Sequence, residues 1–501
     1  MKALFFLSLS LALSWTPARA VELRAGVAKI EITDRAAGPV HDPLFAKALV
    51  LQDGSTSAVL ITIDAVALGE IGRIKNTFVA AVRGRLEKEL GIPGSNVMLT
   101  TSHCHGIVRN DLEELVVQAV KEAWSRPVPV KTGAGLGRED RISENRRLRM
   151  KDGSEVDMRR AYSMPPDEDV SGVGPIDPQI GILRLDRASG GPLAVVYQFA
   201  CHPIQNPPNK GNSADYPGVA SRAIEETLGQ GALAFFIQGC CGDINPVRYK
   251  EVSRSPEAEP LGALLGLSVL RGLKEIAPQE GSRLAITREI IALPRGTDLE
   301  RRMAAIESRR SKLVQSLKPT NINFRSFLPL LLQEKIWPET PSHYSQSYLH
   351  DKSLGRDDLS KLDADNRNAV TAYLQNIRIM EELTRLNTNH ALLKMHLDQN
   401  NAAGNAPLPV EVAGLRVGDF KLVTFPGELT VETGLEIKKA SGEPHAFVSG
   451  YTNGYIYYTP TVKQRNNAGF AQEDCDCVVG AEWQAIFEAN ALEVLKKLSA
   501  H

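Results

Sequence analysis

The stretch Val-Met-Leu-Thr-Thr-Ser-His-Cys-His at residues 97–105 is a short apolar run that ends in a polar cluster. Apolar runs of this length predict buried strands. Three other apolar runs also lead into polar residues: 194–203 reaches His202, 234–246 reaches Asp243, and 422–428 ends at Glu428. Buried strands that deliver two histidines and two carboxylates at their ends indicate one metal-dependent active site.

Within this first run, His103 and His105 are two residues apart. On an extended strand, alternate side chains point to the same face, so both imidazoles would point one way and Cys104 the other. This spacing is typical of metal ligands on a strand.

Length and charge limit the classes of protein to consider. A chain of 501 residues with 43% hydrophobic residues can bury a large core and has room for two to four domains. The formal net charge is -1, which gives no electrostatic case for binding nucleic acid. We therefore expect no nucleic-acid partner, and a small-molecule or lipid substrate stays open.

The N-terminus has the pattern of a signal peptide spanning residues 1–20. Lys2 precedes an apolar stretch from Leu4 to Leu13, and Ala18-Arg19-Ala20 is a cleavage signal, so the mature chain is expected to begin at Val21. No later apolar run has the length of a transmembrane helix. The prediction is a secreted or periplasmic protein without a transmembrane segment, with at most transient contact with a membrane surface.

Six cysteines in an exported chain leave two alternatives open. Four lie in the site strands, and Cys475 and Cys477 lie near the end. One or more disulfides between these groups is one alternative, since bridges within a CxC or between neighbouring cysteines are strained. A soft-ligand site in which thiolates bind zinc or copper is the other.

The rest of the chain alternates between strand and helix patterns. Strands are predicted at 56–64, 97–101 and 232–238, and helices at 73–90, 111–125 and 215–228. This βαβ-like order favours an α/β fold, with a mixed buried sheet flanked by helices.

A charged helical region interrupts this order. Residues 297–406 have few strand signals, and strand-like sequence resumes at Val410. We therefore predict a catalytic domain in two parts, 21–296 and 407–501, separated by a helical insertion. The insertion is either a cap over the site or a peripheral helical layer.

Several motifs resemble those of the neutral/alkaline, non-lysosomal ceramidases. They are, in order, His-x-His at 103–105, Phe-Ala-Cys-His-Pro at 199–203, Gly-Asp-Ile-Asn-Pro at 242–246, Pro-Gly-Glu at 426–428 and Asn-Gly-Tyr-Ile-Tyr-Tyr-Thr-Pro-Thr at 453–461. The segment 26–34 also looks like the start of that catalytic domain. The resemblance covers most of the mature chain except the insertion, and it implies a zinc amidase that cleaves the N-acyl bond of ceramide.

The resemblance also implies roles for individual residues. Zn²⁺ would be held by His103, His202, Glu428 and Tyr458, a chemically sensible set of two imidazoles, a carboxylate and a phenolate. Tyr455 and Tyr457 are close enough in sequence to compete with Tyr458.

Further residues would act around the zinc. Zinc acidifies a water that attacks the amide carbonyl and stabilises the developing oxyanion. His105 would bond the carbonyl oxygen or move a proton, and Arg146 would hold the polar end of the substrate. Asp64 and Asp243 would stand behind the ligands and orient imidazoles or backbone. Without the resemblance, an ordinary cap or loop role for Asp243 and ordinary strand packing of the tyrosines are equally good interpretations.

The chain departs from the family pattern at two positions and at its end. Asn245 stands where the family has a serine close to the reaction, and it can donate a hydrogen bond to an oxyanion but cannot act as a nucleophile. Phe470 stands where the family has a second tyrosine. We also expect the family's C-terminal immunoglobulin-like domain to be absent, because the chain ends about forty residues after the tyrosine motif.

Three hypotheses follow. A zinc amidase for N-acylated lipids requires an apolar groove beside the metal. A zinc hydrolase of the same fold that acts on another amide or ester requires a small polar pocket. A non-catalytic binding protein would keep the fold, and Asn245 and Phe470 are the residues that support it.

Overall fold

The computed structural model describes residues 22–157, 165–205, 211–249, 257–468 and 471–500. The predicted signal peptide and Phe470 lie outside these described residues. Among the described helices, none combines the length and apolar character needed to cross a bilayer.

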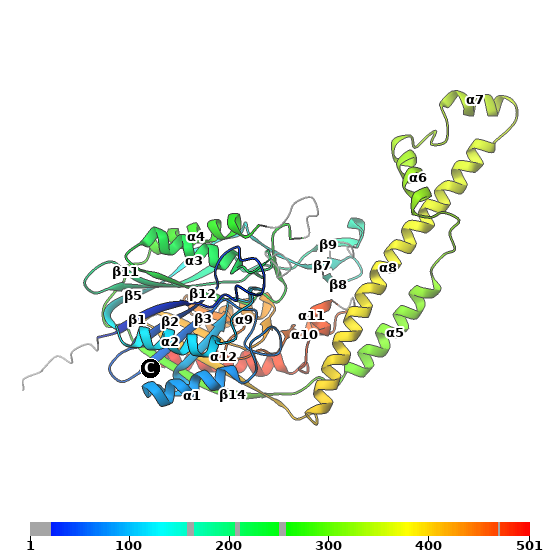
Figure 1. The fold of residues 1–501 in the computed structure, drawn as a ribbon. Coiled ribbons are helices and arrows are strands. Elements are labelled where there is room, and N and C mark those ends of the chain that lie inside the picture. Colours follow the sequence, from blue (N-terminus) through cyan, green and yellow to red (C-terminus); the bar gives the residue numbers. More distant parts are fainter. Residues whose placement is uncertain (1–21, 158–164, 206–210, 250–256, 469–470, 501) are drawn as a thin grey trace, which may run out of the picture.

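The body of the molecule is built on an eight-stranded mixed sheet (Figure 1). Its strands run in the spatial order β12-β11-β10-β5-β1-β2-β3-β4. The pairs β3/β4 and β11/β12 are parallel, and the other neighbours are antiparallel. The strands are β1 (Arg24–Glu31), β2 (Phe45–Gln52), β3 (Ser57–Ile63), β4 (Val97–Thr101), β5 (Val128–Arg138), β10 (Gln179–Arg187), β11 (Pro192–Phe199) and β12 (Leu233–Gln238).

Four helices cover one face of this sheet: α1 (Phe78–Leu90), α2 (Leu112–Trp124), α3 (Asp215–Leu228) and α4 (Ala258–Lys274). Helix α1 connects the parallel pair β3/β4, and α3 connects the parallel pair β11/β12, so the predicted βαβ-like order is observed at both places. Helix α2 lies so close to β1 that a Cβ at Gly26 would be 1.9 Å from the carbonyl oxygen of Ala123. Only glycine fits there.

A second, four-stranded sheet packs on the other face. It has the order β14-β15-β16-β18, and Leu49, Phe235, Leu422 and Phe447 belong to the apolar layer between the sheets. Helices α9 (Val431–Ser441) and α12 (Trp483–Ala500) cover its outer face. The body therefore has four layers, helix–sheet–sheet–helix, which confirms the α/β class and adds a sheet to the single one predicted. Its strands are β14 (Leu284–Leu293), β15 (Leu408–Val417), β16 (Phe420–Thr424) and β18 (Ala446–Ser449).

Short elements at the end of the body carry much of the candidate site. Strand β6 (Ser143–Asn145) pairs with β13 (Ile244–Pro246), and β17 (Glu428–Leu429) pairs with β19 (Tyr458–Thr459). A small three-stranded sheet and two short helices lie nearby: β7 (Arg147–Met150), β8 (Glu155–Asp157), β9 (Val170–Val173), α10 (Val462–Arg465) and α11 (Gln472–Cys475).

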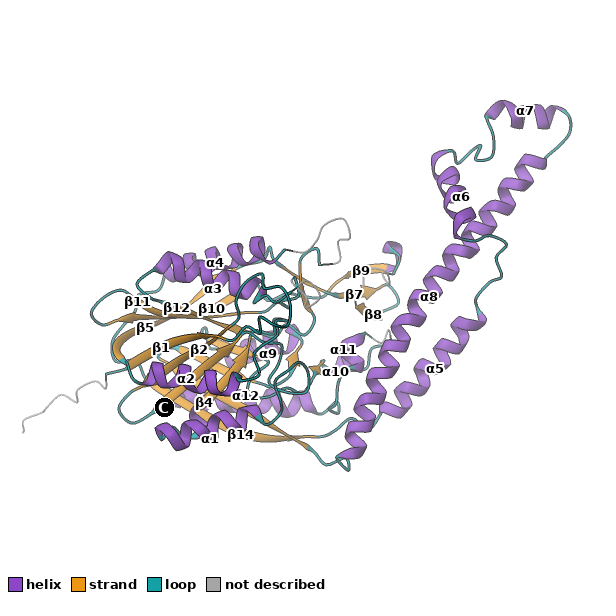
Figure 2. Cartoon of the chain, viewed as in Figure 1, coloured by secondary structure: helices purple, strands orange, loops and turns teal. Residues whose placement is uncertain are grey.

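An all-helical arm projects from this end of the body (Figures 1 and 2). It consists of α5 (Leu299–Gln315), α6 (Phe324–Ile336), α7 (Ser345–Ser353) and α8 (Asp358–Ala402). Helix α8 has 45 residues, and at about 1.5 Å per residue it is roughly 68 Å long. The helical character predicted for 297–406 is thus observed, and the division of the chain into domains stays a prediction.

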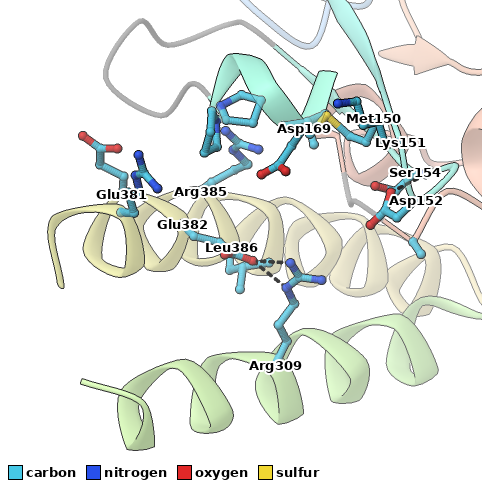
Figure 3. A pocket seen from close by; sticks show the side chains of 15 residues that line it. Met150, Lys151, Asp152, Ser154, Asp169, Arg309, Glu381, Glu382, Arg385 and Leu386 are labelled. Atoms are coloured by element: carbon cyan, nitrogen blue, oxygen red, sulfur yellow. Dashed lines mark hydrogen bonds and ion pairs between the residues drawn. The ribbon is translucent and has the colours of Figure 1, made fainter. Parts of the chain in front are cut away.

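The arm meets the small sheet at a cavity of about 510 Å³ (Figure 3). Arg309 on α5 forms an ion pair with Glu382 on α8 across its floor, and Asp169 and Met150 line the opposite side. The distal half of the arm, with α6 and α7, lies well away from the body (Figure 1).

Candidate metal centre

His103 follows β4 and reaches the site through a turn. The strand ends at Thr101, and His103 has a positive φ of 66°. The prediction that His103 and His105 share an extended strand is therefore wrong, although their rings still lie close, with centroids 5.8 Å apart. Nδ1 of His103 is 2.6 Å from the carbonyl oxygen of Val66. Since that oxygen can only accept, Nδ1 carries the proton and Nε2 has a free lone pair.

His202 follows β11 and is held in the same way. Its Nδ1 lies 2.9 Å from the carbonyl oxygen of Ile244, and its Nε2 lies 3.1 Å from Oε2 of Glu428. The rings of His103 and His202 are 5.1 Å apart. Backbone carbonyls thus fix both imidazoles with Nε2 directed at one point.

Glu428 lies on β17 and completes the group. Its Oε1 is 3.6 Å from Nε2 of His103. One ligand atom from each of His103, His202 and Glu428 lies within 4.8 Å of the others, and all three residues are buried. This group could bind a metal ion.

The protonation states of His103 and Glu428 also suit metal binding. Burial lowers the pKa of His103 to about 4, although the Glu428 carboxylate opposes this shift. Burial alone would raise the pKa of Glu428, but its interactions with His103, His202 and the Tyr455 hydroxyl outweigh burial and lower it. A neutral imidazole beside an ionised carboxylate is the state that zinc requires of its ligands.

Four tyrosines lie on the loop from 451 to 458, and their contacts separate the candidate ligands. The hydroxyl of Tyr458 lies 3.5 Å from Nε2 of His202. Tyr455 donates to Oε1 of Glu428 at 2.5 Å, and Tyr451 donates to Oε2 at 3.1 Å. The hydroxyl of Tyr457 instead donates to Glu70. Tyr458 and Tyr455 therefore face the group, and Tyr457 points away from it.

Tyr451 was not predicted from the sequence. Its ring also packs against His103, with centroids 4.3 Å apart. It stands two residues before the Asn-Gly-Tyr motif that begins at Asn453, and this nearness to the motif is the signal that could have identified it.

Arg146 and Asn245 lie together beside Tyr458. Nη1 of Arg146 donates to Oδ1 of Asn245 at 3.2 Å, and its guanidinium carbon stands 5.5 Å from the centre of the Tyr458 ring. Nε of Arg146 forms a 2.6 Å ion pair with Glu473, another residue that the motifs did not reveal. Arg146 is only 2% exposed, so its contacts in this structure orient Tyr458 and Asn245.

The two aspartates predicted behind the ligands both bind backbone. Asp243 accepts from the amide of Val431 at 2.8 Å, which fixes the start of α9 next to Glu428. Asp64 accepts from the amide of Phe45 at 2.9 Å. Of the two alternatives for these aspartates, orientation of backbone is the one seen, and the imidazoles are oriented by carbonyl oxygens.

The six cysteines are buried thiols, and none forms a disulfide. Burial raises the pKa of the thiol in each of Cys104, Cys201, Cys240 and Cys241, the four that lie near the site. Neutral thiols are poor metal ligands. The group of candidate ligands among the described residues contains no cysteine.

The fold matches that of known ceramidases. No model of a protein family matches the chain. The structure of neutral ceramidase from Pseudomonas aeruginosa aligns with a TM-score of 0.61 and 17% sequence identity, over 96% of this chain and 75% of that chain. A structure described as ceramidase complexed with C2 aligns with a TM-score of 0.60 and 17% identity, over 96% and 76%. The chain therefore has a neutral-ceramidase-like fold, as the motifs predicted.

Proposed function

We propose that this protein is an exported zinc-dependent amidase that hydrolyses the N-acyl bond of ceramide or of a related N-acylated lipid. The observation that supports this most is the convergence of His103, His202 and Glu428 in a buried group within 4.8 Å. The fold supports the class of reaction, because both similar structures are described as ceramidases.

The residues present fit a zinc ion. His103, His202 and Glu428 would hold it, with the Tyr458 hydroxyl as the fourth ligand. Both imidazoles are oriented by backbone carbonyls, as metal-binding histidines usually are. Tyr455 and Tyr451 bind the two carboxylate oxygens of Glu428 and hold that side chain in place.

Zinc, when bound, supplies a Lewis acid that polarises the amide carbonyl and acidifies a water. The protein supplies orientation and proton transfer. His105 is half-buried beside His103, which suits an imidazole that moves a proton to the leaving amine. Asn245, fixed by Arg146, would donate its amide N–H to the developing oxyanion, in place of the serine that the family pattern has there.

Elemental analysis of the purified mature protein, with assays of N-acyl-sphingosine hydrolysis, tests this proposal. We expect about one zinc per chain. The double variant His103→Ala, His202→Ala should lose both the metal and activity, because it removes both imidazole ligands. The matched control is His390→Ala, which changes a histidine on the arm that pairs with Glu307. The control should keep both.

The outcomes separate the remaining hypotheses. Zinc without ceramide turnover would favour a zinc hydrolase of the same fold that acts on another amide or on an ester. Absence of zinc from the wild-type protein would contradict the catalytic proposal and favour a binding protein. N-terminal sequencing of the exported chain tests the signal peptide, with Val21 as the expected first residue.

A further inference from the structure

Large apolar side chains are exposed at the far end of the arm. Phe324, Leu328, Leu332 and Ile336 on α6 are 43–62% exposed. They recur every four residues, so they form one stripe along the helix. An apolar stripe that faces solvent on a helix is a candidate interaction surface.

The opposite side of α6 is anchored to α8. Phe327 is buried and stacks on Tyr373 of α8, with ring centroids 4.5 Å apart. The side chain of Asn323 accepts from the amide of Ser326 and so caps the first turn. The α6–α7 connection is tied to α8 as well, because Ser342 and Tyr348 both donate to Asp363. The stripe is therefore held outward by specific contacts.

The charges on α6 are divided between its two sides. At 3.6 residues per turn, Arg325 and Lys335 fall within the arc that the apolar stripe spans, and both are exposed. The one acidic residue of the helix, Glu334, lies outside this arc and pairs with Arg367 of α8 at 3.4 Å. The outward arc of α6 is thus apolar and cationic.

Aromatic residues extend this surface. Trp337 directly follows α6 and is 56% exposed, and Tyr344 before α7 is 80% exposed. Leu349 on α7 is 68% exposed. Tryptophan and tyrosine favour the headgroup level of a bilayer, and cations beside an apolar stripe complement anionic lipids.

We propose that α6, together with Trp337, Tyr344 and Leu349, is a membrane-docking surface that binds bilayers containing anionic lipids. A second copy of the chain fits this surface less well. In a two-fold interface the same patch meets itself, so Arg325 and Lys335 of both copies would come together with no carboxylate on the arc to pair with them. The proposal does not depend on the zinc site, and for a lipid hydrolase it would keep the protein at the surface that holds its substrate.

Flotation of the full mature chain with vesicles tests this surface. We expect binding to vesicles of phosphatidylcholine mixed with phosphatidylglycerol, and weaker binding to phosphatidylcholine alone. Leu328→Asp, Leu332→Asp should weaken binding by at least about tenfold, since charges are costly in the apolar region. The matched control is Leu267→Asp, Ile290→Asp, which changes two equally exposed apolar residues on the body. The control should bind like the wild type.

Two further measurements test whether α6 and Trp337 themselves contact the vesicles. Arg325→Gln, Lys335→Gln should reduce binding only to the anionic vesicles. The emission of Trp337 should shift to the blue when vesicles are added, and Trp337→Phe should abolish that shift. Equal binding by all the variants would overturn the proposal. So would sedimentation of a dimer that Leu328→Asp, Leu332→Asp disperses, in a protein that does not float with vesicles.

Discussion

The body buries polar side chains, whereas the far end of the arm exposes apolar ones. In the body, polar groups are buried in pairs, such as His103 with Glu428 and Arg146 with Glu473. At the far end of the arm, apolar groups such as Phe324 and Tyr344 are exposed. Charged groups are rarely buried unless they are paired, and large apolar patches are rarely exposed, so both features are candidates for function. On this contrast we propose catalysis for the body and membrane contact for the arm.

The largest effect is expected at the centre of the body. Glu428→Gln keeps the shape of the side chain but removes the charge that His103 and His202 face. We expect a loss of zinc and a fall in turnover on the order of 10³-fold or more, because the metal provides several kcal/mol of transition-state stabilisation. Zinc analysis and steady-state kinetics measure this. Retention of full zinc and activity would remove Glu428 from the site.

The change in the free energy of unfolding should differ between a substitution in the body and one at the end of the arm. Phe235 lies fully buried between the two sheets, and Phe235→Ala should cost about 3–5 kcal/mol in the free energy of unfolding. Leu349→Ser at the exposed end of the arm should change it by less than about 0.5 kcal/mol. Urea denaturation followed by circular dichroism gives both values. A large cost at Leu349 would mean that its side chain packs within the folded chain.

The pH dependence of stability has a source in Asp64. Burial raises the pKa of this carboxyl from 3.8 to about 6, and Lys47 opposes the shift. The folded state then binds the proton more tightly than the unfolded state, so stability falls as the pH rises from about 4 to about 6 and is constant above.

Asp64→Asn should remove this slope. The variant should gain about 2–3 kcal/mol relative to the wild type at about pH 8 and nothing at about pH 4. An asparagine oxygen can still accept from the amide of Phe45. Urea denaturation at the two pH values measures the difference, and an equal gain at both would contradict this origin.

A smaller effect is expected where the arm joins the body. Nε2 of His396 on α8 lies 2.8 Å from the Asp476 carboxylate, and its ring packs on Tyr457, with centroids 4.8 Å apart. The backbone carbonyl of Asp476 in turn accepts from the backbone amide of Tyr458. His396 is therefore a positioning residue for the loop that carries Tyr458.

His396→Ala should lower kcat by about 10–100-fold and leave the zinc content near one, because it loosens a support and removes no ligand. His396→Gln should recover part of the activity by restoring a bond to Asp476. His390→Ala, which changes a half-buried histidine earlier on the same helix, is the control. Loss of zinc in His396→Ala would show that the arm is needed for metal binding itself.

Local signals explain what could be predicted from the sequence. Strand β4 and helix α3 have the predicted boundaries, because an apolar run and a 3.6-residue pattern are local properties. The second sheet was missed, since β14 alternates exposed and half-buried residues and its partner β15 begins more than a hundred residues later.

Local motifs predicted the candidate ligands, but not the contacts that orient them. The motifs predicted the residues of the buried group, His103, His202 and Glu428, through the family resemblance. The turn at His103, the carbonyl of Val66 and the ion pair from Glu473 come from long-range contacts that leave no periodic pattern. The exposure of the arm could not be predicted, because an apolar stripe on a helix normally indicates a buried face.

The most direct test is X-ray absorption at the zinc edge of the purified mature protein. We predict a shell of nitrogen and oxygen ligands at about 2.0–2.2 Å with the multiple scattering of two imidazoles, and no sulfur shell. A Zn–S shell at about 2.3 Å, or no zinc in the protein, would contradict the assignment of His103, His202, Glu428 and Tyr458 as the ligands.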